Sequence, residues 1–172
     1  MEAILPTLSF YLVLGAFAGI MAGLLGVGGG LIIVPALAWI FHQQSISDAV
    51  IMHLAIGTSL ATIVLTSISS VRAHHRRGAV LWPTFWQLAP GIVVGAWLGA
   101  AVADVLSSHA LQKVFAIFVL GMSAQMGFGA KPAPHRDPPG TAGMLAVGGE
   151  IGAVSAIVGI GGGSLTVPFL TW

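Results

Sequence analysis

Long apolar stretches separated by short polar segments dominate the chain. The first stretch covers about residues 8–41, others cover about 49–71, 81–103 and 111–129, and a last one opens at 141. A membrane-spanning helix needs about 20 predominantly apolar residues. The pattern therefore predicts three single membrane helices in the middle of the chain, and a first stretch that is too long for one helix.

Glycines divide that first stretch at Gly26 and at Gly28–Gly30. Each glycine in a helix interior costs about 1 kcal/mol relative to alanine, so we expect a helix near 8–26 and a shorter one near 31–42. Non-helical backbone at membrane depth is tolerated only where protein buries it or where it lines a wet cavity. The break is therefore a candidate binding site, whether the two helices cross the membrane or re-enter it.

The sequence around this break is repeated near the end of the chain. Residues 19–37 align with 152–170, and eight of the nineteen positions are identical, among them the glycines of the break and a following Val-Pro pair. If the first copy crosses twice, five spans separate the starts of the copies, which inverts the second copy as in many secondary transporters. We predict a first repeat over 1–129, a cytoplasmic Pro-rich linker over 130–140 and an incomplete second repeat over 141–172, a fragment that we do not expect to transport alone.

Composition supports a membrane protein. The chain of 172 residues is 56% hydrophobic and only 6% charged, whereas soluble domains carry roughly 25% charged residues. We predict an all-α integral membrane protein, a polytopic helical bundle with an inverted repeat and Gly-broken helices. A net charge of +1 gives no sign of nucleic-acid binding, and the absence of cysteine excludes disulfides and thiolate metal sites. We predict no cofactor and no metal, and no enzyme, because no catalytic constellation lies within the spans.

Basic residues predict the orientation. The loops 72–78 and 131–136 carry most of the lysine and arginine, and such short basic loops stay in the cytoplasm. The loops 43–48 and 104–110, without lysine or arginine, then lie outside. The N-terminus lacks the basic region of a cleaved signal peptide, so we expect the first stretch to remain in the mature protein.

Four segments together resemble one family. They are the Gly-x-Gly-Gly-Gly segments followed by Val-Pro, the Ala-Ile-Gly-Thr-Ser-Leu string (55–60), the loop 75–82 and the glycine-rich span 91–99. The combination resembles the sulfite exporter TauE/SafE family, although most of a second half, including a second Gly-Thr-Ser string, is absent. The resemblance implies a multi-pass transporter of the bacterial inner membrane that exports a small sulfur-containing anion such as sulfite or an organosulfonate. A transporter of another small anion, and a non-transporting scaffold or partner subunit, stay open as alternatives, as does a homo-oligomer.

The glycine breaks are suited to binding an anion. A helix that begins after a break points its free N–H groups and its positive dipole end at the break, where an anion can bind without a buried cationic side chain. The predicted substrate-binding residues are Gly28, Gly29, Gly30, Gly161, Gly162 and Gly163. The alternative is a tight helix crossing that needs small residues.

A polar string in the second region would add donors to the site. In the string Gly57, Thr58 and Ser59, the hydroxyls of Thr58 and Ser59 would donate to an oxyanion, or they would bond back to the carbonyl four residues earlier. The residue chemistry alone leaves these two readings equal, and the family resemblance favours a lining role.

His53 and Glu150 are candidates for coupling transport to protons. Placing an ionisable side chain within a membrane segment costs free energy, so we expect such a residue to have a function. His53 is also readily explained as an interfacial histidine bonded to a neighbour. Glu150 lies about nine residues into the last stretch, unless that span begins later and leaves it at the interface.

Overall fold

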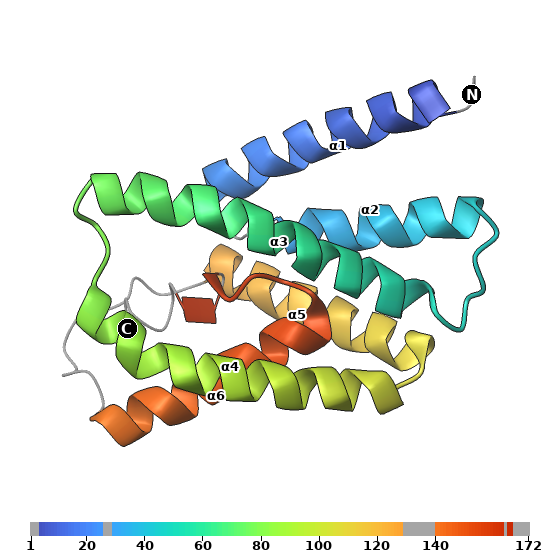
Figure 1. Ribbon diagram of the computed structural model, residues 1–172. Coiled ribbons are helices and arrows are strands. Elements are labelled where there is room, and N and C mark those ends of the chain that lie inside the picture. The colour runs from blue at the N-terminus through green and yellow to red at the C-terminus, as the bar shows by residue number, and fades with distance from the viewer. Residues whose placement is uncertain (1–3, 26–28, 129–139, 164, 167–172) are drawn as a thin grey trace.

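The computed structural model describes residues 4–25, 29–128, 140–163 and 165–166. These residues form six helices (Figure 1): α1 (Ile4–Leu25), α2 (Gly30–Gln43), α3 (Ile51–Arg76), α4 (Trp82–Val105), α5 (Ser108–Phe128) and α6 (Thr141–Val158). The predicted helical bundle is confirmed. Most predicted ends lie within three residues of the observed ones; α1 begins four residues earlier than expected and α3 ends five residues later, because the basic segment after Val71 continues the helix.

Helix lengths locate the first break relative to the bilayer. By length and composition α3, α4 and α6 are able to cross a membrane. Helix α2 has only 14 residues, which is about 21 Å at 1.5 Å per residue, against a hydrocarbon core of about 30 Å. If its C-terminal end lies at one surface, its first residue, Gly30, lies inside the core.

Successive helices alternate in direction. Along the colour gradient of Figure 1, α1 runs from right to left and α6 from left to right. The two copies of the repeated segment therefore begin with helices of opposite direction, as an inverted repeat requires. Helix α2 packs mainly on α3, α4 packs on α6, and α5 contacts both α3 and α6.

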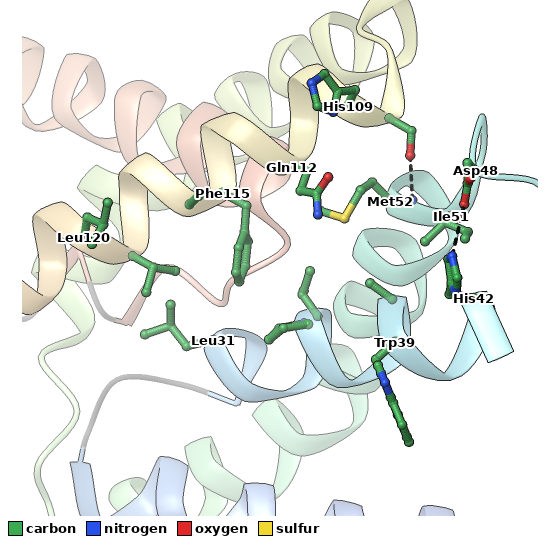
Figure 2. A pocket seen from close by; sticks show the side chains of 16 residues that line it. Leu31, Trp39, His42, Asp48, Ile51, Met52, His109, Gln112, Phe115 and Leu120 are labelled. Carbon is green, nitrogen blue, oxygen red and sulfur yellow. Dashed lines mark hydrogen bonds and ion pairs between the residues drawn. The ribbon is translucent and has the colours of Figure 1, made fainter.

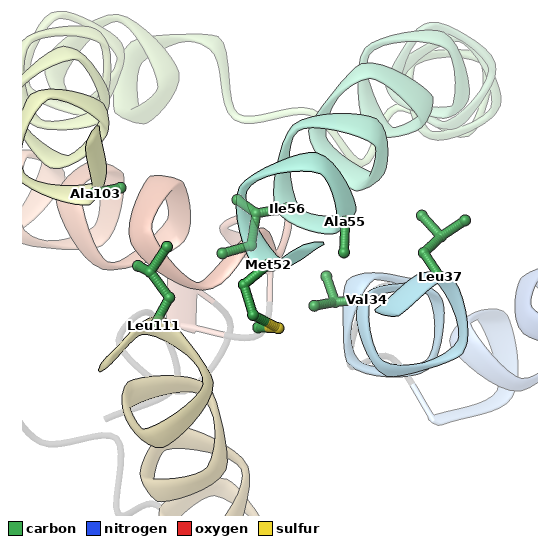
Figure 3. Close-up of a cluster of buried hydrophobic side chains, with 7 residues drawn as sticks. All are labelled: Val34, Leu37, Met52, Ala55, Ile56, Ala103 and Leu111. Carbon is green, nitrogen blue, oxygen red and sulfur yellow. The ribbon is translucent and has the colours of Figure 1, made fainter. Parts of the chain in front are cut away.

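A cluster of buried side chains joins α2, α3, α4 and α5 (Figure 3). Helices α2 and α3 supply most of it, and one residue each comes from α4 and α5: Val34, Leu37, Met52, Ala55, Ile56, Ala103 and Leu111. In lipid the hydrophobic effect does not drive helices together, so such a cluster stabilises the bundle through close packing.

The α4–α6 crossing is closer still, because backbone meets backbone. Gly91, Gly95 and Gly99 share one face of α4, and their Cα atoms lie against carbonyl groups of α6. From the other side, a Cβ placed on Gly148 would lie 2.6 Å from the carbonyl oxygen of Leu88. The residue numbers of the contacts rise together, so the two helices run parallel. This is the small-residue packing typical of membrane helices.

Two hydrogen bonds tie helix ends together on the side of the α2–α3 and α4–α5 loops. The Ser108 hydroxyl accepts from the backbone N–H of Met52 at 3.0 Å, which caps the first turn of α3. The Nε2 atom of His53 lies 3.1 Å from the Ala103 carbonyl oxygen at the end of α4. Both loops therefore lie at one end of the bundle, as the predicted topology requires.

Candidate functional site at the two glycine breaks

Helix α6 ends at the second glycine break. Gly159 adopts the left-handed conformation, with φ of 76°, and its N–H donates to the Ser155 carbonyl oxygen at 2.9 Å. This is a common way to end a helix, and it favours glycine because a Cβ is strained at positive φ. Helical residues resume at Gly163. The predicted interruption of the last apolar region is therefore present.

The two copies start their second helices in the same way. In the first, the Gly29 carbonyl oxygen accepts from the N–H groups of Ile32 and Ile33, at 3.1 and 2.9 Å. In the second, the Gly162 carbonyl oxygen accepts from Leu165 and Thr166, at 3.1 and 2.8 Å. These residues are equivalent in the repeat, so the sequence repeat is also a repeat of backbone hydrogen bonding.

The two breaks touch each other. The Cα atom of Gly30 packs against the carbonyl oxygen of Gly159, and a Cβ at Gly30 would lie 2.8 Å from the Cα atom of Ile160. Gly30 and Gly159 are buried, and Ile160 is 2% exposed. The start of α2 and the end of α6 therefore meet inside the bundle, although the repeat separates them widely in sequence.

Ser59 of α3 holds the second break. Its hydroxyl donates to the Gly159 carbonyl oxygen at 2.8 Å, and the side chain is fully buried. A carbonyl at a helix end lacks an intrahelical partner, and leaving it unpaired in lipid is costly. Because the Ser59 hydrogen is used in this bond, the residue contributes to the site by fixing the break; its remaining lone pairs only accept.

Further side chains surround the second break. The Ser155 hydroxyl donates to the Ile160 carbonyl oxygen, and the Thr166 hydroxyl donates to that of Gly162 at 2.8 Å. A Cβ on Gly161 would lie 3.3 Å from Cγ2 of Ile63, and one on Gly162 would lie 3.1 Å from Cγ2 of Ile151. The hydroxyls thus satisfy carbonyl oxygens, which leaves the N–H groups at the helix starts as the donors that face the break.

The N-terminus of α2 carries no side-chain cap among the described residues. Gly29 occupies the N-cap position and has no side chain to offer. The Ile32 N–H donates to the Gly29 carbonyl oxygen, whereas the N–H groups of Gly30 and Leu31 have no acceptor within the helix, and Gly30 lies at a buried contact. A ligand with acceptor oxygens is one way to satisfy them.

The remaining predicted binding residues are less enclosed. Gly57 and Thr58 lie on the exposed face of α3, away from Ser59, because successive helix positions point in different directions. Gly163 is exposed, and no described atom lies within 4 Å of a Cβ placed on it. Gly28 lies outside the described residues.

The predicted coupling residues lie apart from the breaks. His53 lies in the first turn of α3, about 9 Å along the helix from Ser59. Since Ala103 offers a carbonyl, Nε2 must carry the hydrogen; Nδ1 is buried and has no partner among the described residues. Helix α6 begins at Thr141, so Glu150 lies in the middle of the helix, with an exposed side chain. A coupling role stays a prediction for both residues.

A cavity of about 970 Å³ runs along α2 (Figure 2). It lies between α2 and α5, with Leu31 and Leu120 at one end and His42 and Asp48 at the other. Leu31 is the residue next to Gly30, so the cavity leads from the start of α2 to the α2–α3 loop. The lining is mostly apolar, and its polar side chains gather at the loop end: His42, Asp48, Ser108, His109 and Gln112.

Sequence reasoning did not identify Ser155 or this cavity. A signal existed for Ser155, because a hydroxyl four residues before the break glycine is well placed to bond a free carbonyl. The cavity residues come from three helices and the α2–α3 loop and share no motif, so the sequence offers no signal for them. Among the described residues no group of three His, Asp or Glu side chains is placed to hold a metal ion.

Comparison with known proteins gives one consistent result. The model of the family "Sulfite exporter TauE/SafE" matches residues 11–172. A "Probable membrane transporter protein" of Haemophilus influenzae is 37% identical over 93% of this chain and 61% of its own length. Proteins described in the same words from Bacillus subtilis and Methanocaldococcus jannaschii are each 30% identical, over 91% and 95% of this chain. No solved structure gives a significant match.

The chain spans less than two thirds of the length of these relatives, between 61% and 64%. The family match nevertheless covers α1 from Tyr11, the break contact and α6, the elements from which the repeat was recognised. A polytopic helical membrane protein with two homologous halves is also what the resemblance implies. The chain therefore belongs to the sulfite exporter TauE/SafE family of membrane transporters.

Proposed function

We propose that this protein contributes the anion-binding site of a secondary transporter that exports a small sulfur-containing anion, such as sulfite or an organosulfonate, across the bacterial inner membrane. The observation that carries the proposal is the contact of Gly30 with Gly159 and Ile160. That contact joins the start of α2 to the end of α6, three residues before Gly162, whose carbonyl oxygen begins a second helix with the same hydrogen-bond pattern. The name of the family supports the class of substrate.

Binding would rely on backbone N–H groups. The starts of α2 and of the helix after Gly162 present free N–H groups and two positive dipole ends. An oxyanion has acceptor oxygens on several sides, so it can bridge the two starts and replace its hydration shell with N–H donors. Ser59 and Ser155 would keep the neighbouring carbonyl oxygens occupied, so that these do not repel the anion.

The cavity along α2 offers a route to this site. It extends from Leu31, beside the break, to His42 and Asp48 at the loop that we predict to lie outside. Its apolar middle would hold an anion only weakly, which suits passage rather than storage. Rocking of the two repeats about the break contact would then expose the site to each side in turn.

Binding and transport test the proposal separately. Purified protein is titrated with sulfite, thiosulfate and sulfate, and thermal stability is recorded. We expect saturable stabilisation by at least one anion, lost in Gly163→Val and retained in the control Gly121→Val, since neither site has a described atom within 4 Å of a Cβ. No stabilisation by any anion, or equal stabilisation of both variants, would contradict the anion site.

The route is tested by labelling, because the chain has no cysteine of its own. Cysteines replace Ala38 and Ala116, which line the cavity from α2 and α5, in this chain joined to a complete second repeat without cysteine, and proteoliposomes are loaded with labelled sulfite. A bulky thiol reagent should stop efflux from both variants and leave Gly121→Cys unaffected. Efflux that continues after complete labelling of both variants would exclude this cavity as the route.

A further inference from the structure

Helix α1 has a face of small residues on which no other described residue packs. No described atom lies within 4 Å of a Cβ placed on Gly15, Gly19 or Gly23, and Ala16 is exposed. Helix α1 packs on the bundle mainly through α2, and its buried residue Ala18 points to a different side. A glycine that faces lipid has no side chain to pack against the lipid tails, so exposure to lipid does not explain why this face is made of small residues.

The repeat supplies an independent observation. Extending the repeat alignment toward the N-terminus pairs Leu12 with Leu145, Gly15 with Gly148, and Gly19 with Gly152. The three pairs are identical, and their members lie on one face of each helix. On α6 these are the residues that pack against the backbone of α4. Within the part of the chain that the structure describes, the same face is therefore occupied on α6 and open on α1; Leu145 is 39% exposed, and Leu12 is 67% exposed.

We propose that the face formed by Leu12, Gly15, Ala16 and Gly19 docks a second membrane helix of the α4 type. Its occupant is the α4 counterpart of a complete second repeat, with small residues at every fourth position. The length of the relatives supports this choice, since about two fifths of the Haemophilus influenzae protein lies outside the match. The proposal concerns assembly and does not depend on which solute is carried.

The α4–α6 crossing gives the register of this contact. A Cβ on Gly148 would lie 3.2 Å from the N atom of Ile92, and one on Gly152 would lie 2.8 Å from the N atom of Ala96. By the repeat, Gly15 should face the position of Ile92 in the docked helix and Gly19 the position of Ala96. The docked helix should run parallel to α1, as α4 runs parallel to α6.

The probe is a synthetic peptide of residues 82–105, which carries the α4 face and is long enough to form a membrane helix by itself. It bears a fluorophore, and binding to the full chain in bicelles is measured by energy transfer. We expect saturable binding, weakened about tenfold or more by Gly15→Ile or Gly19→Ile, because a branched side chain prevents close backbone approach. The control Gly121→Ile, also on an open helix face, should bind as the unchanged chain does.

Disulfide crosslinking tests the register. Gly15→Cys in the chain should crosslink to a peptide with Ile92→Cys, and not to one with Val102→Cys, ten residues further along. Binding that is absent, or insensitive to both isoleucine variants, would overturn the proposal. So would crosslinking of Gly15→Cys chiefly to a second copy of the chain, which would assign the face to a homodimer.

Discussion

The α4–α6 crossing and the contact between the two glycine breaks both bring backbone against backbone, but they use glycine differently. At the crossing the glycines recur every four residues on one helical face, and a Cβ on Gly91, Gly95 or Gly99 would meet the backbone of α6. At the breaks the glycines are consecutive, and packing or positive φ requires only some of them, namely Gly30 and Gly159. The crossing holds two helices together, whereas the breaks retain glycines that no contact in the described structure demands.

The largest effect is expected at the crossing. In Gly95→Val the new side chain meets the Gly149 backbone, whose Cα would be 2.7 Å from the added Cβ. The backbone at a helix crossing can shift only slightly to accommodate the new side chain, so we expect the free energy of unfolding to fall by about 3 kcal/mol. Unfolding in mixed micelles with rising SDS fraction, followed by circular dichroism, measures it. Gly121→Val serves as the control, and equal stability of the two variants would contradict the assignment of this crossing.

A smaller loss is expected for Gly159→Ala in the second break. Positive φ disfavours a Cβ by about 1 kcal/mol, and the Cβ would also lie 3.1 Å from the Ile56 Cα atom. The matched variant is Gly78→Ala, at φ of 67° with no described atom within 4 Å. The same unfolding assay should show a greater loss for Gly159→Ala than for Gly78→Ala. Equal losses would mean that backbone conformation alone selects glycine there.

Ser59→Ala should destabilise the break contact by about 1.5 kcal/mol, because it leaves a buried carbonyl oxygen without its donor. Ser67→Ala is the control, since that exposed hydroxyl bonds only to a carbonyl in its own helix and should change stability by less than about 0.5 kcal/mol. Indistinguishable effects of the two variants would argue that Ser59 does not hold the second break.

The smallest change in stability is expected for Gly163→Ala. The site has no described neighbour and begins a helix, so the free energy of unfolding should move by less than about 0.5 kcal/mol. Under the proposed function the methyl group still obstructs the approach of an anion, so the stabilisation by sulfite should weaken. Unchanged stability together with unchanged anion binding would leave this glycine unexplained.

The helices were predictable because apolar length and glycine breaks are local properties of the sequence. The Gly159 break followed from the repeat in the same way. Contacts between distant elements were not predictable. The spacing of Gly91, Gly95 and Gly99 predicts a close helix crossing, but it does not indicate that α6 is the partner. Ser59 and Thr58 look alike in sequence, yet one is fully buried on Gly159 and the other is exposed. Which of two adjacent hydroxyls faces inward depends on the rotation of α3, which its neighbours fix.

The bond from Ser59 to Gly159 also bears on how the protein is made. Its two ends lie 100 residues apart in the chain, and ribosomes add about 5–20 residues each second. The hydroxyl of Ser59 is therefore synthesised between about 5 and 20 seconds before the carbonyl that it will bind. During that interval α2 and α3 exist without the second break. The first repeat is consequently synthesised before its contact with the second break can form. That contact forms only after α6 has been synthesised.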